Sequence, residues 1–212
     1  FAFVGFRIAN ASLDPAAMLN LAVTGRQYGG VLRADYRGGE RFFARVEFGF
    51  ASGDDRPGFG ARPAAQSGRA GDLDGLQFDL TRTPRDVNIQ NFRFHPNYRV
   101  DLIMWRRLIG TVTDAVYLRP HVRYTALDLG TSRVTLSLAG IASFAIEAGS
   151  TPGGQSPLGV ELDPTIAYRH DDGFGVALEH AVLFPLSGLD NPDLNLKAQP
   201  AQLLRVRAAY VF

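Results

Sequence analysis

The chain has 212 residues, a formal net charge of +1 and no cysteine. Lack of cysteine excludes disulfides, thiolate metal sites and cysteine nucleophiles, and the near-neutral charge gives no overall attraction for nucleic acids. Apolar residues make up 46% and charged residues 20%, a balance that excludes bulk disorder, and no stretch approaches the roughly 18 consecutive apolar residues of a spanning helix. Because the sequence starts at Phe1 without a signal peptide, we expect a processed or partial chain.

Alternation of apolar and polar residues, the pattern of a β-strand with one apolar face, runs through most of the sequence. In chain order the predicted strands are residues 1–9, 18–26, 31–37, 41–51, 76–82, 98–108, 116–126, 135–147, 160–169, 174–184 and 204–212. No segment shows the period of an amphipathic helix. The eleven segments predict an all-β fold, and most of them are near the roughly 9–11 residues that cross a bilayer as tilted strands.

The connections between these strands alternate in length. Residues 38–40, 128–132 and 170–173 are short turns, whereas residues 53–75, 147–158 and 185–201 are long loops. Short turns at one end and long loops at the other are typical of outer-membrane barrels. Three connections do not fit: residues 27–30 and 109–115 are too short, and residues 83–97 are too long unless a strand lies near 91–95. Eleven strands is also an odd number, so we expect 11–12 visible strands of a larger barrel whose upstream strands are missing.

The C-terminal strand favours a membrane barrel over a soluble sheet. Apolar residues occupy every second position from Leu204, and the chain ends Tyr210-Val211-Phe212. This segment resembles the terminal strand that the assembly machinery of outer-membrane barrels recognises, which makes Tyr210 and Phe212 the predicted assembly signal. We therefore predict that residues 1–212 form the C-terminal portion of an antiparallel transmembrane β-barrel in the bacterial outer membrane. A soluble β-sandwich binding module remains the alternative from another class.

A second resemblance lies in residues 91–107, Asn-Phe-Arg-Phe-His-Pro-Asn-Tyr-Arg-Val-Asp-Leu-Ile-Met-Trp-Arg-Arg. The segment is similar to part of the alginate-export type of barrel in proteobacteria. That resemblance implies a wide barrel with an arginine-lined lumen that passes an anionic polysaccharide. It covers about a twelfth of the chain, and no other segment matches the family residue by residue.

The polar faces of the predicted strands are rich in arginine, and 21 of the 22 basic residues of the chain are arginines. The register predicts 13 inward arginines against 7 acids, Asp35, Glu47, Asp79, Asp101, Glu161, Asp163 and Glu179. Rings of arginine select anions in pores, whereas arginine–carboxylate pairs would only brace the wall. The candidate lumen-lining residues are Arg41, Arg45, Arg99, Arg107, Arg119, His121, Arg123, Arg169, Arg205 and Arg207; Arg7, Arg26, Arg33 and Arg37 complete the inward set.

Catalytic and metal sites find little support. His180 lies on an apolar strand face without an assignable serine partner, and His170 to Asp172 lie in a short turn. Asp72 and Asp74 match a fragment of a Ca²⁺ loop that lacks the closing Glu. We expect a pore for small anions or an anionic polymer such as a polysaccharide, with no enzyme activity, cofactor or metal. A plugged, structural or adhesive barrel in a larger complex is the alternative. The expected partners are outer-membrane lipid, the barrel-assembly machinery and other envelope proteins, with no nucleic acid.

Overall fold

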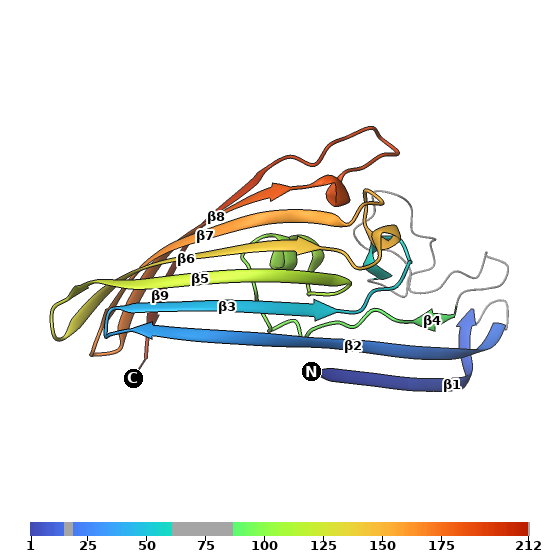
Figure 1. Ribbon diagram of the computed structural model, residues 1–212, viewed down its shortest axis with the longest axis horizontal. Coiled ribbons are helices and arrows are strands. Elements are labelled where there is room, and N and C mark those ends of the chain that lie inside the picture. Colours follow the sequence, from blue (N-terminus) through green and yellow to red (C-terminus); the bar gives the residue numbers. More distant parts are fainter. Residues whose placement is uncertain (15–18, 61–86, 212) are drawn as a thin grey trace.

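A single curled sheet of nine strands dominates the computed structural model, which describes residues 1–14, 19–60 and 87–211. Eight strands follow one another in the order β1-β2-β3-β5-β6-β7-β8-β9, each antiparallel to the next, and the short β4 pairs parallel to β2 (Figure 1). The sheet is not closed into a barrel. The strands are β1 (Ala2–Asp14), β2 (Leu19–Gly38), β3 (Phe42–Ala51), β4 (Asn88–Ile89), β5 (Ala115–Asp128), β6 (Ser132–Phe144), β7 (Pro157–His170), β8 (Phe174–Pro185) and β9 (Ala201–Tyr210).

The predicted all-β class is confirmed, but two predicted strands are one. Residues 19–26 and 31–37 both belong to the single 20-residue β2, and Gln27–Gly30, predicted as a loop, lies inside it. Gly29 pairs with Ala2 of β1 on one side and with Ala51 of β3 on the other. A Cβ at Gly29 would lie 2.4 Å from the ring of Phe92. Glycine is therefore needed here for a close ring contact and not for a turn.

The predicted strand at residues 98–108 is wrong. This segment is irregular and contains a six-residue π-helix, η2 (Met104–Ile109). Residues 102–105 are consecutive buried apolar residues, and a strand of a one-sided sheet would have exposed half of them. The predicted strand at 76–82 lies outside the described residues, and residues 91–95 contribute one isolated bridge, between Arg93 and Thr113.

The topology is simpler than the sequence predicts, because each long strand of the sheet pairs with the long strand before it in the chain. β3 and β5 pair with each other although residues 52–114 separate them, and the described parts of that stretch contain η1 (Gly58–Gly60), β4 and η2. The turns after β2, β5 and β7 lie at one end of the sheet, which we call the short-turn end. The connections after β3, β6 and β8 lie at the other, which we call the long-loop end. Among the described residues, no helix is long and apolar enough to cross a membrane.

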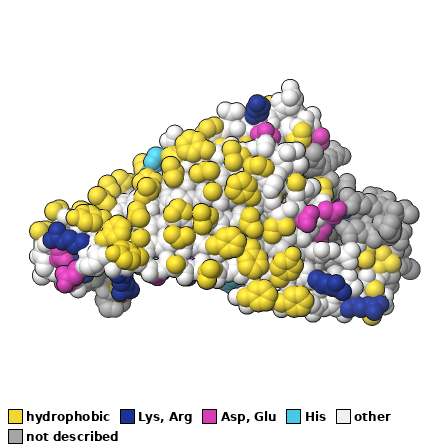
Figure 2. Space-filling model, in the orientation of Figure 1, with side chains coloured by type: hydrophobic (Ala, Val, Ile, Leu, Met, Phe, Trp, Pro, Cys, Tyr) yellow, Lys and Arg dark blue, Asp and Glu magenta, His cyan; other side chains and the backbone are white. Residues whose placement is uncertain are grey.

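One face of the sheet, the apolar face, is lined with hydrophobic side chains. The pairing carries them from strand to strand: Phe48 lies opposite Leu118, Leu118 opposite Ala142, and Val160 opposite Phe184. They remain exposed, for example Leu138 at 45% and Leu204 at 70%. Figure 2 shows them spread over the sheet in a band with charged side chains toward both ends. No described element covers this band.

The opposite face, the inner face, holds the buried core near the long-loop end. Here residues 90–114, the crossing segment, pack against inward side chains of β5, β6, β7 and β8 (Figure 1, the green coil behind β5 and β6). Trp105 and Met104 of the crossing segment contribute its largest apolar side chains, together with Phe59 from the loop after β3. Toward the short-turn end the inner face instead carries exposed polar and charged residues.

Candidate functional site

The crossing segment is fixed to the inner face by Glu161, which lies in the half of β7 nearer the long-loop end. Glu161 Oε1 accepts hydrogen bonds from the backbone N–H of Leu102 at 2.9 Å and of Ile103 at 2.8 Å. Its Oε2 accepts a third, from Met104, at 2.9 Å. The side chain is fully buried, so the three N–H groups take the place of water around the carboxylate. Glu161 therefore serves as an anchor and contributes little charge to the solvent-exposed surface.

Asp101 stabilises the start of the π-helix in the same way. Its Oδ2 accepts the N–H of Trp105 at 2.8 Å and its Oδ1 that of Arg106 at 3.1 Å. The indole Nε1 of Trp105 donates to Ser143 Oγ of β6 at 3.1 Å. Burial, and then the nearby Glu161 carboxylate, raise the pKa of Asp101 to about 7. The crossing segment is thus attached to two neighbouring strands, to β7 through Glu161 and to β6 through Ser143.

A second attachment is centred on Glu47 of β3. Glu47 Oε1 accepts hydrogen bonds from the hydroxyls of Tyr98 at 2.9 Å and Tyr117 at 2.8 Å. Its Oε2 pairs with Arg33 Nε, and Arg33 Nη2 donates to the Tyr98 hydroxyl at 2.6 Å. Tyr98 belongs to the crossing segment, whereas the other three residues belong to β2, β3 and β5. This network ties the segment to three further strands.

The end of the crossing segment is anchored by Asp114. Its carboxylate accepts the backbone N–H of Glu147 at 2.8 Å and the hydroxyl of Ser150, both in the β6–β7 loop. Burial raises the pKa of Asp114 to about 7. The crossing segment and a long loop therefore form one packed body at the long-loop end.

An arginine cluster occupies the inner face nearer the short-turn end. The ring of Phe43 lies between two guanidinium groups, with Arg45 Cζ 5.4 Å and Arg123 Cζ 5.1 Å from its centroid. The ring of His121 contacts Phe43 edge-on at 5.9 Å. Arg45 also pairs with both carboxylate oxygens of Asp35, each at 2.7 Å. Cations around an aromatic ring on an exposed sheet face can bind anions bidentately.

The register places most of the predicted lumen residues together. Seven occupy inward positions of the strands: Arg45, Arg119, His121, Arg123, Arg169, Arg205 and Arg207. Arg41 lies in the turn between β2 and β3, directly before β3. Arg205 and Arg207 share Glu179, whose Oε2 is 3.2 Å from Arg207 Nε. Arg41, Arg123 and Arg169 are exposed and form no ion pair with any described residue. The exposed charge on this part of the inner face is therefore mainly positive.

Other predicted positions differ. Arg99 and Arg107 are exposed but belong to the crossing segment, since no strand exists there. Arg26 lies on the opposite face from Arg33, because both belong to one regular strand and are separated by an odd number of residues. Arg7 faces the same way as Arg26, as its pairing with Thr24 shows. Asp79, Asp72, Asp74 and Phe212 lie outside the described residues, and Tyr210 lies on the apolar face opposite Phe174.

Sequence reasoning missed the anchoring roles of Glu161, Asp101 and Glu47. One signal was present: Asp101 precedes the uninterrupted apolar run 102–105, and such a run does not fit a strand with one wet face. His180 does lie on the apolar face, opposite Leu204, while His170 and Asp172 contact each other within their short turn at 3.0 Å. In the described part of the chain, no group of three or more His, Asp or Glu side chains is arranged to hold a metal ion.

Comparison of the chain with protein-family models, with curated proteins and with solved structures gives no match. The features that bear on function are therefore the two faces of the sheet and the crossing segment packed on the inner face.

Proposed function

We propose that this chain forms the wall of a bacterial outer-membrane β-barrel whose inner face lines a path for small anions or an anionic polymer such as a polysaccharide. The observation that carries the proposal is the uncovered apolar face. Its hydrophobic side chains run in register across β3, β5, β6, β7, β8 and β9. Soluble monomers rarely expose an apolar surface of this extent, whereas barrel strands present one to lipid.

The length of the strands and the position of the charges support the same proposal. β5 and β7 have 14 residues each and β6 has 13, longer than the 5–6 residues usual in soluble sheets. In Figure 2 charged side chains gather at the two ends of the band and are sparse within it. A soluble β-sandwich would need a second sheet on this band, and the described residues form one sheet only.

The preference for anions follows from how the acids of the inner face are used. Glu161 and Asp101 are buried and bound to backbone N–H groups, and Glu47 is buried among Arg33 and two tyrosines. These carboxylates offset little of the exposed charge of Arg41, Arg123 and Arg169. A water-filled passage along this face would therefore have a positive potential, which favours anions.

The crossing segment favours a second candidate, a plugged or structural barrel. It buries apolar side chains such as Trp105 against the inner face near the long-loop end, where an open pore would be wet. The two candidates share the membrane-embedded wall. They differ in whether the crossing segment only narrows the passage or closes it.

A pair of substitutions in β6 tests the membrane-embedded wall. Leu138 lies on the apolar face and Thr135 on the inner face of the same strand. Against lipid, Leu138→Arg should lower the free energy of unfolding by about 2–4 kcal/mol, while Thr135→Arg should have a small effect. The measurement is urea unfolding in liposomes, followed by heat-modifiable gel migration. A protein that stays monodisperse without detergent and tolerates both substitutions equally would contradict the proposal.

A further inference from the structure

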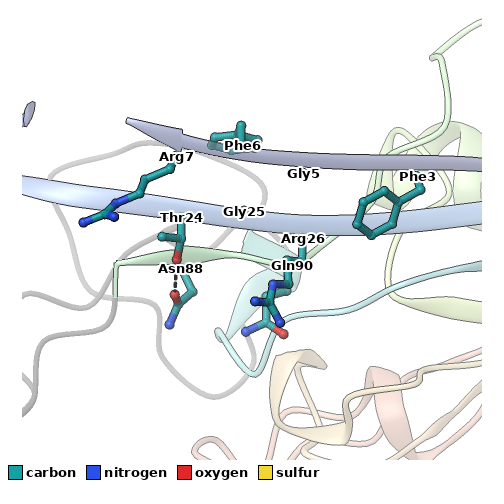
Figure 3. A pocket seen from close by; sticks show the side chains of 9 residues that line it. All are labelled: Phe3, Gly5, Phe6, Arg7, Thr24, Gly25, Arg26, Asn88 and Gln90. Atoms are coloured by element: carbon teal, nitrogen blue, oxygen red, sulfur yellow. Dashed lines mark hydrogen bonds between the residues drawn. The ribbon is translucent and has the colours of Figure 1, made fainter. Parts of the chain in front are cut away.

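A hollow at the edge of the apolar face is lined by two arginines, Arg7 and Arg26, that lie away from the inner face. The cavity has a volume of about 550 Å³ and lies where β1, β2 and β4 meet. Its lining includes Phe3, Arg7, Thr24, Arg26, Asn88 and Gln90. Figure 3 shows the side chains of Arg7, Thr24, Arg26, Asn88 and Gln90 extending to the same side of the strands, while Phe6 lies on the other side.

The register locates this hollow relative to the apolar band. Arg26 has the same strand parity as Tyr28 and Leu32, which are exposed on the apolar face. Phe3 lies opposite Tyr28, and Arg7 lies opposite Thr24, two residues further toward the long-loop end. The two arginines therefore lie on the membrane-facing side of the proposed wall, just beyond the end of the apolar band.

The hollow has two positive charges and no acidic residue in its lining. Neither Arg7 nor Arg26 forms an ion pair with any residue that the structure describes. On the inner face, by contrast, Arg33 and Arg45 each have a carboxylate partner. The remaining polar groups of the hollow are the amides of Asn88 and Gln90 and the Thr24 hydroxyl, which donates to Asn88 Oδ1 at 2.7 Å. Two guanidinium groups with neighbouring amides match the oxygens of a phosphate.

We propose that Arg7 and Arg26 bind the phosphate of a lipid headgroup at the long-loop edge of the bilayer. The site rests on the proposed function, because lipid headgroups would lie beside Arg7 and Arg26 only if the apolar band faces the lipid of a bilayer. Phe3 packs beside the acyl–headgroup boundary, and the arginines neutralise the phosphate above it. A phosphorylated lipid is favoured over a soluble phosphate because the hollow continues directly into the apolar band.

Native mass spectrometry from detergent tests the site with bisphosphorylated lipid A and with the same lipid after removal of its phosphates. The wild-type chain should retain the phosphorylated lipid preferentially, and Arg7→Gln and Arg26→Gln should each weaken retention by about tenfold. The control is Arg37→Gln. Like Arg26→Gln, it removes one positive charge from β2, but from the inner face. It should leave lipid retention unchanged.

Three results would overturn the inference: equal retention of the two lipids, equal loss in Arg37→Gln, or complete competition by millimolar inorganic phosphate. The last would show a site for a soluble anion. Failure here is distinguishable from failure of the proposed function, because a chain without a lipid-facing wall would be monodisperse without detergent. If the chain requires detergent but retains both lipids equally, this binding site is wrong and the proposed membrane-embedded wall still stands.

Discussion

The carboxylate of Glu161 in β7 accepts a 2.9 Å hydrogen bond from the backbone N–H of Met104, although 57 residues separate the two in the chain. Together with the bonds from Leu102 and Ile103, it holds an irregular segment against the inner face of a regular sheet. This relationship decides how wide a passage along that face can be, because the segment lies where solvent would otherwise be.

Glu161→Gln should loosen the crossing segment. The amide keeps one acceptor oxygen and directs an NH₂ group toward backbone N–H donors, so at least one charge-assisted bond is lost, worth about 1.5–3 kcal/mol. Hydrogen exchange at the amides of Leu102 to Met104 should become about tenfold faster or more. Glu179→Gln is the control, since Glu179 pairs with Arg205 and Arg207. Unchanged exchange in Glu161→Gln would show that packing alone holds the segment.

Gly49→Ala should destabilise the sheet. Gly49 in β3 lies opposite Tyr117 in β5, and a Cβ at this position would lie 2.3 Å from the tyrosine ring. Displacing the ring would also break its hydrogen bond to Glu47. We expect a loss of about 1–3 kcal/mol in urea unfolding. At Gly175 in β8 the nearest atom would be 3.6 Å away, so Gly175→Ala should cost much less. Equal costs would contradict the close contact.

The crossing segment should open more easily as the pH rises from 5 to 8. The pKa of Asp101 is about 7 in the folded chain, above its ordinary value of 3.8, so the folded state binds the proton more tightly. The stability that the Asp101 carboxyl contributes is therefore present in full below about pH 4 and is lost as the pH rises through 7. Trp105 is the chain's one tryptophan and is buried, so acrylamide quenching of its fluorescence should increase with pH.

Two variants test the source of this pH dependence. Asp101→Asn should reduce the slope of the quenching profile without abolishing it, because Asp114 also has a raised pKa. Asp172→Asn should leave the profile unchanged, because the N–H of Phe174, and then His170, lower the pKa of Asp172 and keep it ionised throughout this range. A profile with the same slope in all three proteins would assign the effect to other groups.

Arg41→Gln with Arg123→Gln should reduce anion preference. Arg123 is exposed on the inner face and Arg41 is exposed in the turn that leads into β3, and neither forms an ion pair with a described residue, so both charges are directed into solvent. The chloride-to-potassium permeability ratio should fall several-fold in the double variant. Arg133→Gln is the control, because Arg133 pairs with Asp128 beside the short turn at 3.3 Å. An unchanged ratio in the double variant would place the selective region elsewhere.

How much the sequence predicts depends on whether each segment follows a period of two. β5 to β9 alternate over most of their length, with register shifts only near Thr125 and Ser143, so their faces and approximate bounds follow from the pattern alone. The sequence predicts two strands where β2 is one, because Gly29 and Gly30 resemble a turn. In the structure, the missing side chain at Gly29 leaves room for the ring of Phe92. Residues 98–108 imitate a strand because Arg99, Asp101 and Arg107 are separated by even numbers of residues, which would place all three on one strand face.

The anchors could not be predicted because they join distant segments. Glu161 and Glu47 sit at ordinary inward strand positions, and nothing local distinguishes them from solvated acids. Apart from Arg33, which pairs with Glu47 from the neighbouring strand, their partners are backbone N–H groups and tyrosines more than 50 residues away. The inward arginines of β3, β5, β7 and β9 are predictable because they depend on strand parity only. Parity fails for Arg7 and Arg26, which lie on the opposite face, and for Arg99 and Arg107, which lie in no strand, while the burial of the acids depends on where the crossing segment lies.

Planar-bilayer conductance of the refolded full-length protein under a KCl gradient tests the central claim most directly. An open pore with this inner face should give stable channels whose reversal potential favours chloride, and Glu161→Gln should increase their conductance. Absence of conductance, in protein shown by heat-modifiable migration to be folded and membrane-inserted, would contradict the open pore. The crossing segment would then be a plug, and the chain a structural barrel.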